Sequence, residues 1–315
     1  MDWADRIGSR IRLRDLHILL AVAESGSMSK AATQLAISYP VVSKTISDLE
    51  QTVGVRLFDR TSQGVELTTY GQTLLKCGVL VFDEMRQGLK QIKFLTDPNS
   101  GELRIGCREM FVVGLLPAIL ERFWRRHPRI RVHVVHAYTA MQQFQELRAR
   151  NVELLIGLMP LTPFQEEDLF VEPLFDEPFV SVAGNHSRWA RRREIGLAEL
   201  VDEPWVLPPY DSAGGTLIAE IFRINKLEPP TPALTTLSIQ LTVSLVATGR
   251  FVGLMPRSVA QFSAGRFGLR ILPVKLPMPP LSTILITIKH RTLSPLAERF
   301  IACVREVSAS LARAK

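Results

Sequence analysis

The pattern of residues 39–52 restricts what this chain can fold into more than any other stretch. Its apolar side chains recur at helical spacing and predict a buried helix face made by Val42, Ile46, Leu49 and Val53. The opposite face is short and polar and carries Tyr39, Ser43, Lys44 and Ser47. Such a face suits a helix that enters the DNA major groove, because small donors and acceptors reach base edges and a lysine reaches phosphate. A solvated helix face has the same periodicity, so the spacing alone leaves both interpretations open.

Two shorter helices are predicted before this one. Residues 16–23 have one apolar helical face, and Gly26 ends that helix. In the second helix Ala31 and Ala32 face inward, and their small side chains allow two helix backbones to approach closely. Pro40 fits the first turn of the third helix, because the N–H that it lacks has no intrahelical partner there.

A β-hairpin is predicted directly after the three helices, from residues 55–58 and 65–67. Such a hairpin is a wing, and its tip would place Arg60 against the phosphate backbone of DNA. Three helices followed by a wing make a winged helix-turn-helix, a module that binds duplex DNA.

Several short motifs follow one another in this segment. They are an Ala-Ala pair, a Ser-x-Pro-x-x-Ser entry into the third helix, Leu-Glu near its end, Gly-x-x-Leu-Phe-x-Arg and Leu-Thr-x-x-Gly. With these motifs, residues 12–75 closely resemble the N-terminal region of LysR-type transcriptional regulators.

The resemblance implies roles for individual positions. The helix-turn-helix would span Met28 to Ser47, and the DNA contacts would be Ser29, Tyr39, Pro40, Ser43, Lys44 and, on the wing, Arg60. Most relatives carry Gln before the proline, where this chain has Tyr39. Gln bonds an adenine edge at two points, whereas Tyr offers one hydroxyl and an apolar ring that can touch a thymine methyl. We therefore expect a different base preference at this position.

Residues 69–96 predict one long helix with apolar positions seven residues apart. These positions form two rows offset by three, Leu75, Phe82 and Leu89 beside Gly78, Met85 and Ile92. Two such rows predict a coiled-coil seam between two chains, with contacts at Leu75, Phe82, Met85, Leu89 and Ile92. A helix packed on its own domain also fits so short a repeat. The family resemblance implies a homodimer, and further a tetramer built as a dimer of dimers.

From residue 102 onward, predicted strands and helices alternate after a hinge at 96–101. This alternation predicts parallel strand pairing and an α/β fold. By the same family resemblance, residues 102–315 would form an effector-binding domain of two α/β lobes, similar to type 2 periplasmic binding proteins. Lobe one would take 102–172 and 275–315, and lobe two would take 173–274.

The expected chain is thus an α plus α/β protein in three parts. A winged helix-turn-helix DNA-binding domain at 11–68 is followed by a linker and dimerisation helix at 69–96 and by the effector-binding domain. It would be a sequence-specific regulator whose DNA binding or bending responds to a small molecule held between the lobes.

Residues at the carboxyl ends of the predicted strands are the candidates for binding that molecule, because ligands of open α/β sheets bind there, opposite helix N-termini. They are Arg108, Glu109, Phe111, Tyr138, Thr139, Met159, Tyr210, Asp211, Ser238 and Ile239. Arg108 favours a carboxylate, while Glu109 and Asp211 favour hydroxyls or an amine, so a hydroxylated organic acid or a sugar-like ligand is expected. Strand-end residues also serve as caps and turn formers, and each position retains that alternative.

Charge does not identify the DNA-binding segment. The chain carries a formal net charge of +7, but residues 1–98 contribute only +1 of it. Pattern and resemblance therefore carry the prediction. The three cysteines show no metal-ligand spacing and fit a reducing compartment.

Other functional classes fit the sequence less well. We find no phosphate loop, nucleophile elbow or His/Glu metal spacing, and we expect no enzymatic activity, no cofactor and no metal. A solute-binding protein would explain the second half alone, but not the DNA-binding segment, and no signal peptide is evident. We expect a cytoplasmic protein whose partners are double-stranded DNA, a small effector and itself, with no membrane contact.

Overall fold

The computed structural model describes residues 10–61, 64–137, 139–159, 166–276 and 281–313. The chain divides into two compact units, Met1–Leu89 and Lys90–Lys315. We call them unit 1 and unit 2. None of the helices in the described part of the chain combines the length and the apolar character that a membrane crossing requires.

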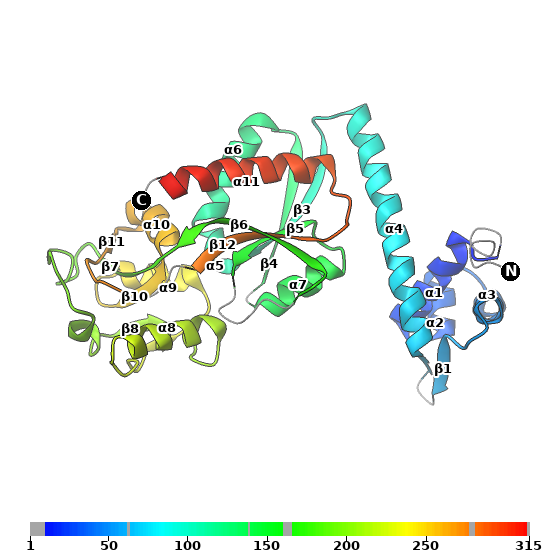
Figure 1. Cartoon of the computed structure of the whole chain (residues 1–315), viewed down its shortest axis with the longest axis horizontal. Coiled ribbons are helices and arrows are strands. Elements are labelled where there is room, and N and C mark those ends of the chain that lie inside the picture. Colours follow the sequence, from blue (N-terminus) through cyan, green and yellow to red (C-terminus); the bar gives the residue numbers. More distant parts are fainter. Residues whose placement is uncertain (1–9, 62–63, 138, 160–165, 277–280, 314–315) are drawn as a thin grey trace. The chain divides into compact units, whose positions relative to one another are not determined.

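Unit 1 is built on three short helices (Figure 1). They are α1 (Leu13–Ser25), α2 (Met28–Gln34) and α3 (Tyr39–Val53). α1 ends at Gly26, whose backbone is left-handed with φ of 62°, and the Ser27 hydroxyl caps α2. Fully buried side chains such as Leu19, Ala31 and Ile46 join the three helices in one core. The predicted order of three helices is confirmed.

The wing follows as an antiparallel pair of strands, β1 (Phe58–Thr61) and β2 (Gly64–Leu67). Phe58 lies opposite Leu67, and both pack on the core of the three helices. The hairpin is thereby fixed to the helices at its base.

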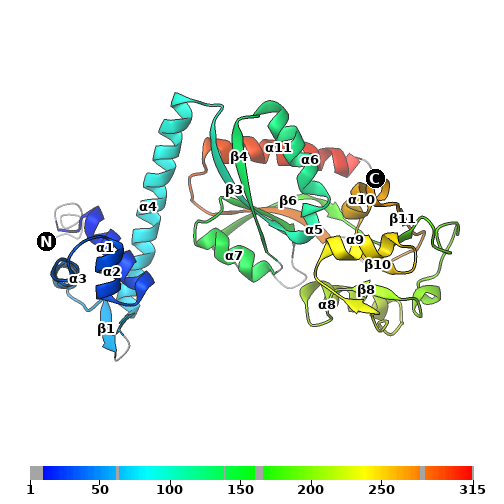
Figure 2. The same ribbon diagram turned by 180° about the vertical axis from the view of Figure 1, so that it is seen from behind.

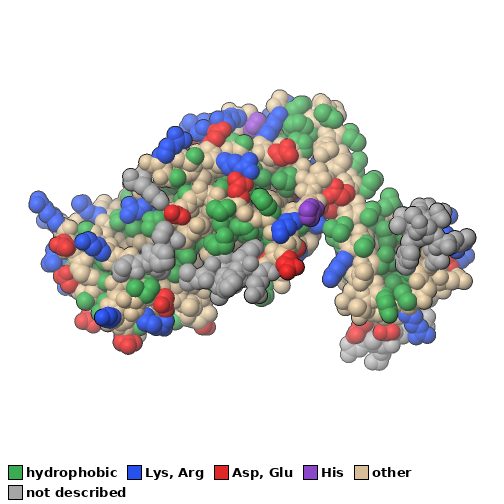
Figure 3. Space-filling view, viewed as in Figure 1, with side chains coloured by type: hydrophobic (Ala, Val, Ile, Leu, Met, Phe, Trp, Pro, Cys, Tyr) green, Lys and Arg blue, Asp and Glu red, His purple; other side chains and the backbone are tan. Residues whose placement is uncertain are grey.

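The helix α4 (Thr69–Thr96) follows the wing and has two different faces. Phe82 packs on the core of unit 1, with its ring centroid 5.9 Å from that of His17. Met85, Leu89 and Ile92 remain exposed, by 52%, 63% and 62%. Phe82 therefore packs on its own domain, which is the alternative that the heptad pattern left open, and the exposed apolar stripe lies farther along the helix (Figure 3).

Lobe one of unit 2 is a five-stranded sheet with the order β4-β3-β5-β12-β6. Its strands are β3 (Gly101–Arg108), β4 (Ile130–Ala137), β5 (Leu154–Leu158), β6 (Leu169–Glu177) and β12 (Leu281–Ile288). The strands β3, β4 and β5 run parallel, and β12 pairs antiparallel with β5 and β6.

Helices cover both faces of this sheet. The short α5 (Glu109–Val112) follows β3 directly, and the others are α6 (Leu115–Arg126), α7 (Ala140–Arg148) and α11 (Pro295–Arg313). α6 and α11 lie on one face and α7 on the other (Figures 1 and 2). The main core of lobe one lies under α6 and α11, with Ile105, Phe123 and Phe300 fully buried in it.

Lobe two has a second five-stranded sheet with the order β11-β7-β10-β8-β9. Its strands are β7 (Phe179–Gly184), β8 (Trp205–Leu207), β9 (Leu234–Thr235), β10 (Val252–Pro256) and β11 (Leu269–Ile271). Helix α8 (Ala213–Ile224) packs on one face, where Trp205 and Phe222 meet edge to face. Helices α9 (Ile239–Ala247) and α10 (Arg257–Phe267) pack on the other. The predicted two-lobed α/β fold is confirmed.

The chain leaves lobe one at the end of β6. The expected boundary at residue 172 falls inside this strand, which pairs with β12 from Leu169 to Glu177. The step into lobe two is therefore the single residue Pro178, before β7 begins at Phe179. The chain re-enters the lobe-one sheet at Leu281, the first residue of β12, which lies opposite Glu177.

Candidate functional site

The exposed side of α3 is the first candidate site. Tyr39, Pro40 and Lys44 are exposed at its N-terminal end, and Ser43 is half-buried. Ser29 is exposed on α2, which packs on α3. The helix thus offers one hydroxyl-rich face with a single lysine, and its buried face holds it in place through the core.

The wing is anchored to this helix by a residue that the periodicity did not single out. Glu50 Oε1 accepts hydrogen bonds from the backbone N–H groups of Leu57, at 2.8 Å, and Phe58, at 3.2 Å. The Leu-Glu motif contained this residue, but its role depends on where the wing folds back. Arg60 lies in β1 opposite Val65, and its side chain is outside the described residues.

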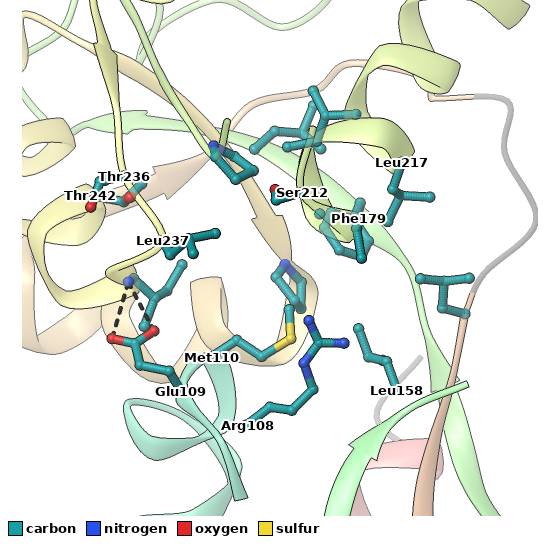
Figure 4. A pocket seen from close by; sticks show the side chains of 18 of the residues that line it. Arg108, Glu109, Met110, Leu158, Phe179, Ser212, Leu217, Thr236, Leu237 and Thr242 are labelled. Atoms are coloured by element: carbon teal, nitrogen blue, oxygen red, sulfur yellow. Dashed lines mark hydrogen bonds between the residues drawn. The ribbon is translucent and has the colours of Figure 1, made fainter. Parts of the chain in front are cut away.

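The second candidate site is a cavity of about 330 Å³ in unit 2, lined by residues of both lobes (Figure 4). Most of its lining side chains are apolar, among them Met110, Leu158, Met159, Phe179, Leu217, Leu237 and Leu254. The volume is in the range of cavities that hold small organic ligands.

Two charged residues stand together where β3 ends in this cavity. Among the described residues, Arg108 has no ion-pair partner, and its guanidinium extends among apolar side chains near Leu158 (Figure 4). Burial lowers the pKa of Arg108 from its ordinary value. Glu109 turns toward lobe two, where its carboxylate oxygens lie 3.1 and 2.9 Å from the backbone nitrogen of Ile239. Burial raises the pKa of Glu109, against the lowering effect of hydrogen bonds from the α9 backbone.

Lobe two brings two helix N-termini to the cavity. Ser212 caps α8 by accepting a hydrogen bond from Gly215 N–H, and Asp211 lies beside it in the lining. A Cβ on Gly215 would lie 2.0 Å from the carbonyl oxygen of Pro209, so the chain needs glycine to turn this tightly. Ile239, the first residue of α9, lines the cavity as well.

The structure places six of the expected effector residues in the cavity lining and three elsewhere. Those in the cavity lining are Arg108, Glu109, Thr139, Met159, Asp211 and Ile239. Phe111 is fully buried in the lobe-one core, and the Tyr210 hydroxyl donates to the carbonyl of Pro230. Ser238 caps α9 by accepting from Leu241 N–H, and Tyr138 lies outside the described residues.

Sequence reasoning missed most of the apolar lining. Leu158 and Leu254 lie in strands that have the pattern of ordinary core, and Leu217 sits on the apolar face of α8. Phe179 is the first residue of β7, and its position at the step between the lobes places it in the cavity lining. Its position directly after the step from lobe one to lobe two is the sequence signal that could have identified Phe179.

The described residues contain no cluster of three or more His, Cys, Asp or Glu side chains that would hold a metal ion. Cys107 is fully buried, and burial raises the pKa of its thiol. It therefore packs as a small apolar side chain in the core of lobe one.

Both units match established family models. Residues 13–72 match the bacterial regulatory helix-turn-helix protein, lysR family, and residues 96–309 match the LysR substrate binding domain.

Curated relatives and solved structures agree with these matches. The chain is 30% identical to the Hca operon transcriptional activator HcaR of Escherichia coli over 303 residues, which cover 96% of this chain and 99% of HcaR. It is 26% identical to the regulator GbpR of Azospirillum brasilense, over 95% of this chain and 87% of that protein. A variant of full-length OxyR from Pseudomonas aeruginosa has a similar fold, with a TM-score of 0.62 and 21% identity over 93% of this chain and 97% of OxyR. The chain belongs to the LysR family of DNA-binding transcriptional regulators, with an N-terminal helix-turn-helix domain and a C-terminal substrate-binding domain for an effector.

Proposed function

We propose that the effector of this regulator is a small organic acid with an apolar body. One observation carries the proposal: the guanidinium of Arg108 lies, without an ion-pair partner among the described residues, in a cavity whose walls are mainly apolar. An unpaired cation in such surroundings is costly, and a ligand carboxylate removes that cost by pairing with it.

The other residues that line the cavity determine the chemical character of the rest of the ligand. The apolar side chains of Met110, Leu158 and Phe179 suit a hydrocarbon chain or ring, and they fit a sugar poorly. Asp211, on the lobe-two side, offers acceptors for one hydroxyl of the acid. The positive ends of α8 and α9 add to the attraction for an anion.

We propose further that Ser29, Tyr39, Pro40, Ser43, Lys44 and Arg60 contact DNA. The exposed polar face of α3, opposite its buried one, supports Tyr39, Pro40, Ser43 and Lys44. Ser29 is exposed on α2, which packs on α3, and Arg60 lies in the wing strand β1. Met85, Leu89 and Ile92 would join two chains, because an exposed apolar stripe of a long helix gains stability by pairing with its copy. On these assignments residues 11–68 bind DNA, 69–96 dimerise, and 102–315 sense the effector.

Binding of the acid would change the angle between the two lobes and hence DNA binding or bending, which is a two-state mechanism. Since the relatives are transcription regulators, we infer that this chain acts by binding rather than by catalysis, in the cytoplasm where its DNA lies.

A thermal-unfolding screen of the full chain tests the ligand class. Small aliphatic and aromatic monocarboxylic acids are each compared with the corresponding uncharged amide. We expect acids to raise the melting temperature and amides to have little effect. Arg108→Gln should weaken the best acid about ten- to hundred-fold, as loss of a charged hydrogen bond of roughly 1.5–3 kcal/mol requires.

Two outcomes would contradict the proposal. Amides that bind as well as their acids would remove the role of charge, and an Arg108→Gln protein with unchanged acid affinity would remove the role of this residue. A footprint on DNA upstream of the protein's own gene, with and without the best acid, then shows whether binding alters the DNA complex.

A further inference from the structure

The two lobes are joined across the cavity by a carboxylate. Glu109 is the first residue of α5 in lobe one, and Ile239 is the first residue of α9 in lobe two. Both oxygens of the Glu109 carboxylate lie within 3.1 Å of the Ile239 backbone nitrogen (Figure 4). The contact links residues 130 positions apart in the chain.

Helix α9 does not depend on this contact for a local cap. Its own Ser238 hydroxyl already accepts a hydrogen bond from Leu241 N–H at 3.3 Å. Glu109 supplies a second acceptor at the positive end of the helix dipole, where its ionised form is favoured. It thus provides there what a ligand carboxylate would provide.

The charges of the neighbouring residues fit this interpretation. Arg108 precedes Glu109 in the chain and lines the same cavity, yet the two side chains form no ion pair with each other. The carboxylate accepts hydrogen bonds at a helix end, and the guanidinium has no ion-pair partner in the part of the chain that the structure describes. An incoming acid that pairs with Arg108 meets a second carboxylate in the same small cavity, and two like charges at close range repel.

We propose that the Glu109 side chain mimics the carboxylate of the effector. It occupies the N-terminus of α9 in the unliganded protein, and the acid takes over that position by displacing it. This inference rests on the proposed binding of an organic acid in the cavity.

Displacement would break one contact between the lobes and leave another of the same kind. Glu177, at the end of β6, holds the N-terminus of α10 through a 2.9 Å hydrogen bond from Ser258 N–H to its Oε1. Glu177 lies at the step between the lobes, in the lining of a separate cavity. An acid bound beside Arg108 would therefore break the Glu109 contact and leave the Glu177 contact in place.

The test is chemical rescue with acetate, which supplies a carboxylate and almost no apolar body. Full-length wild type, Glu109→Ala and Ser238→Ala are unfolded by heat in sodium acetate and, at equal ionic strength, in sodium chloride. Tryptophan fluorescence reports mainly on unit 2, because Trp124, Trp189 and Trp205 lie there. Ser238→Ala is the matched control, since it weakens the same helix end without removing a carboxylate.

We expect Glu109→Ala to melt below wild type in chloride and to recover in acetate. Its apparent acetate affinity should exceed that of wild type at least ten-fold, because no internal carboxylate competes. Ser238→Ala should lose stability without acetate-specific recovery. Equal acetate responses in wild type and Glu109→Ala, or equal recovery of Ser238→Ala, would overturn the proposal.

If Glu109→Ala does not fold, Glu109→Gln replaces it, because the amide keeps the shape and an acceptor for Ile239 but removes the charge. The same criterion then applies: acetate must bind at least several-fold more tightly than to wild type. Neither experiment involves DNA or the true effector. If larger acids do not bind while acetate rescues Glu109→Ala, the proposed effector class is refuted, and with it the displacement of Glu109 by the effector. The rescue would then show only that a carboxylate at the N-terminus of α9 stabilises unit 2.

Discussion

Gly64 lies against Gly26, so that a Cβ added to Gly64 would be 2.2 Å from the carbonyl oxygen of Gly26. The next residue, Val65, donates its backbone N–H to that same oxygen at 3.0 Å. Gly64 also has φ of 142°, which side chains disfavour. We expect Gly64→Ala to displace the wing from the α1–α2 turn and to destabilise unit 1 by roughly 1–3 kcal/mol. Urea unfolding and a DNA gel shift measure the two effects.

Gly265→Ala is the control for this change. Gly265 lies exposed in α10. Apart from its two chain neighbours and the backbone of its own helix, no atom of the described residues lies within 4 Å of an added Cβ, so alanine should be neutral or stabilise by about 0.5–1 kcal/mol. A Gly64→Ala protein that unfolds and binds DNA as wild type does would show that the close approach is not required.

Tyr39→Ala should relax base preference at one operator position. Tyr39 is 49% exposed at the N-terminal end of α3, where a ring and a hydroxyl can reach a base edge. Binding to a series of singly substituted operators measures the preference. An unchanged order of affinities across that series would rule out base reading by Tyr39.

Lys44→Ala, on the same face of α3, provides the contrasting case. Loss of a phosphate contact should weaken binding to all sequences about equally and lower the slope of log affinity against log salt by roughly one. The two variants together separate base reading from phosphate contact. A Lys44→Ala protein with an unaltered salt slope would contradict the phosphate role.

Met85→Glu combined with Ile92→Glu should separate the chains of a dimer. Both side chains are more than half exposed on α4, and paired glutamates would repel across a helix seam. Sedimentation at several protein concentrations measures the association. Phe82 is unsuitable for this test, because it packs on its own domain and a charge there would unfold unit 1.

Gln91→Glu serves as the charge control, since Gln91 is a polar exposed residue of the same helix, away from the apolar stripe. It should leave the dimer intact. Dimers that persist in the double glutamate variant would place the interface elsewhere.

Glu177→Gln should remove a pH dependence from the stability of unit 2. Burial raises the pKa of Glu177 above its ordinary value of 4.5, so the folded protein holds this proton more tightly than the unfolded chain. The stabilising contribution is present below the unfolded pKa and is lost as pH rises through the folded pKa. The free energy of unfolding of wild type relative to Glu177→Gln should therefore increase as pH falls toward 4.5. A difference that stays flat over the acidic range would contradict the shift.

The recognition helix and the order of elements could be predicted because they depend on local patterns. Val42, Ile46 and Leu49 are buried as their spacing required, since helical periodicity is a property of a few neighbouring residues. Glu50 shows what a local pattern does not predict, because its hydrogen bonds to Leu57 and Phe58 depend on where the wing folds back.

Part of the cavity lining was predictable in both lobes, Arg108 and Glu109 in lobe one and Asp211 and Ile239 in lobe two, but most of the apolar lining was not. Strand ends pointed to Arg108 and Glu109, because topology places such ends at a ligand cleft. The contact of Glu109 with Ile239 joins segments that no sequence pattern relates, since it depends on how the lobes close. Phe111 shares the same short helix, but a turn of α5 directs it into the core.

Glu177 and Leu281 are neighbours in adjacent strands, although 103 residues of the chain lie between them. Lobe two is thus an insertion into a hairpin of lobe one, whose ends already meet. A short turn joining Glu177 to Leu281 would close lobe one into an uninterrupted sheet. Lobe one therefore has a complete sheet of its own, and the cavity exists because the segment between these two residues places a second sheet beside it.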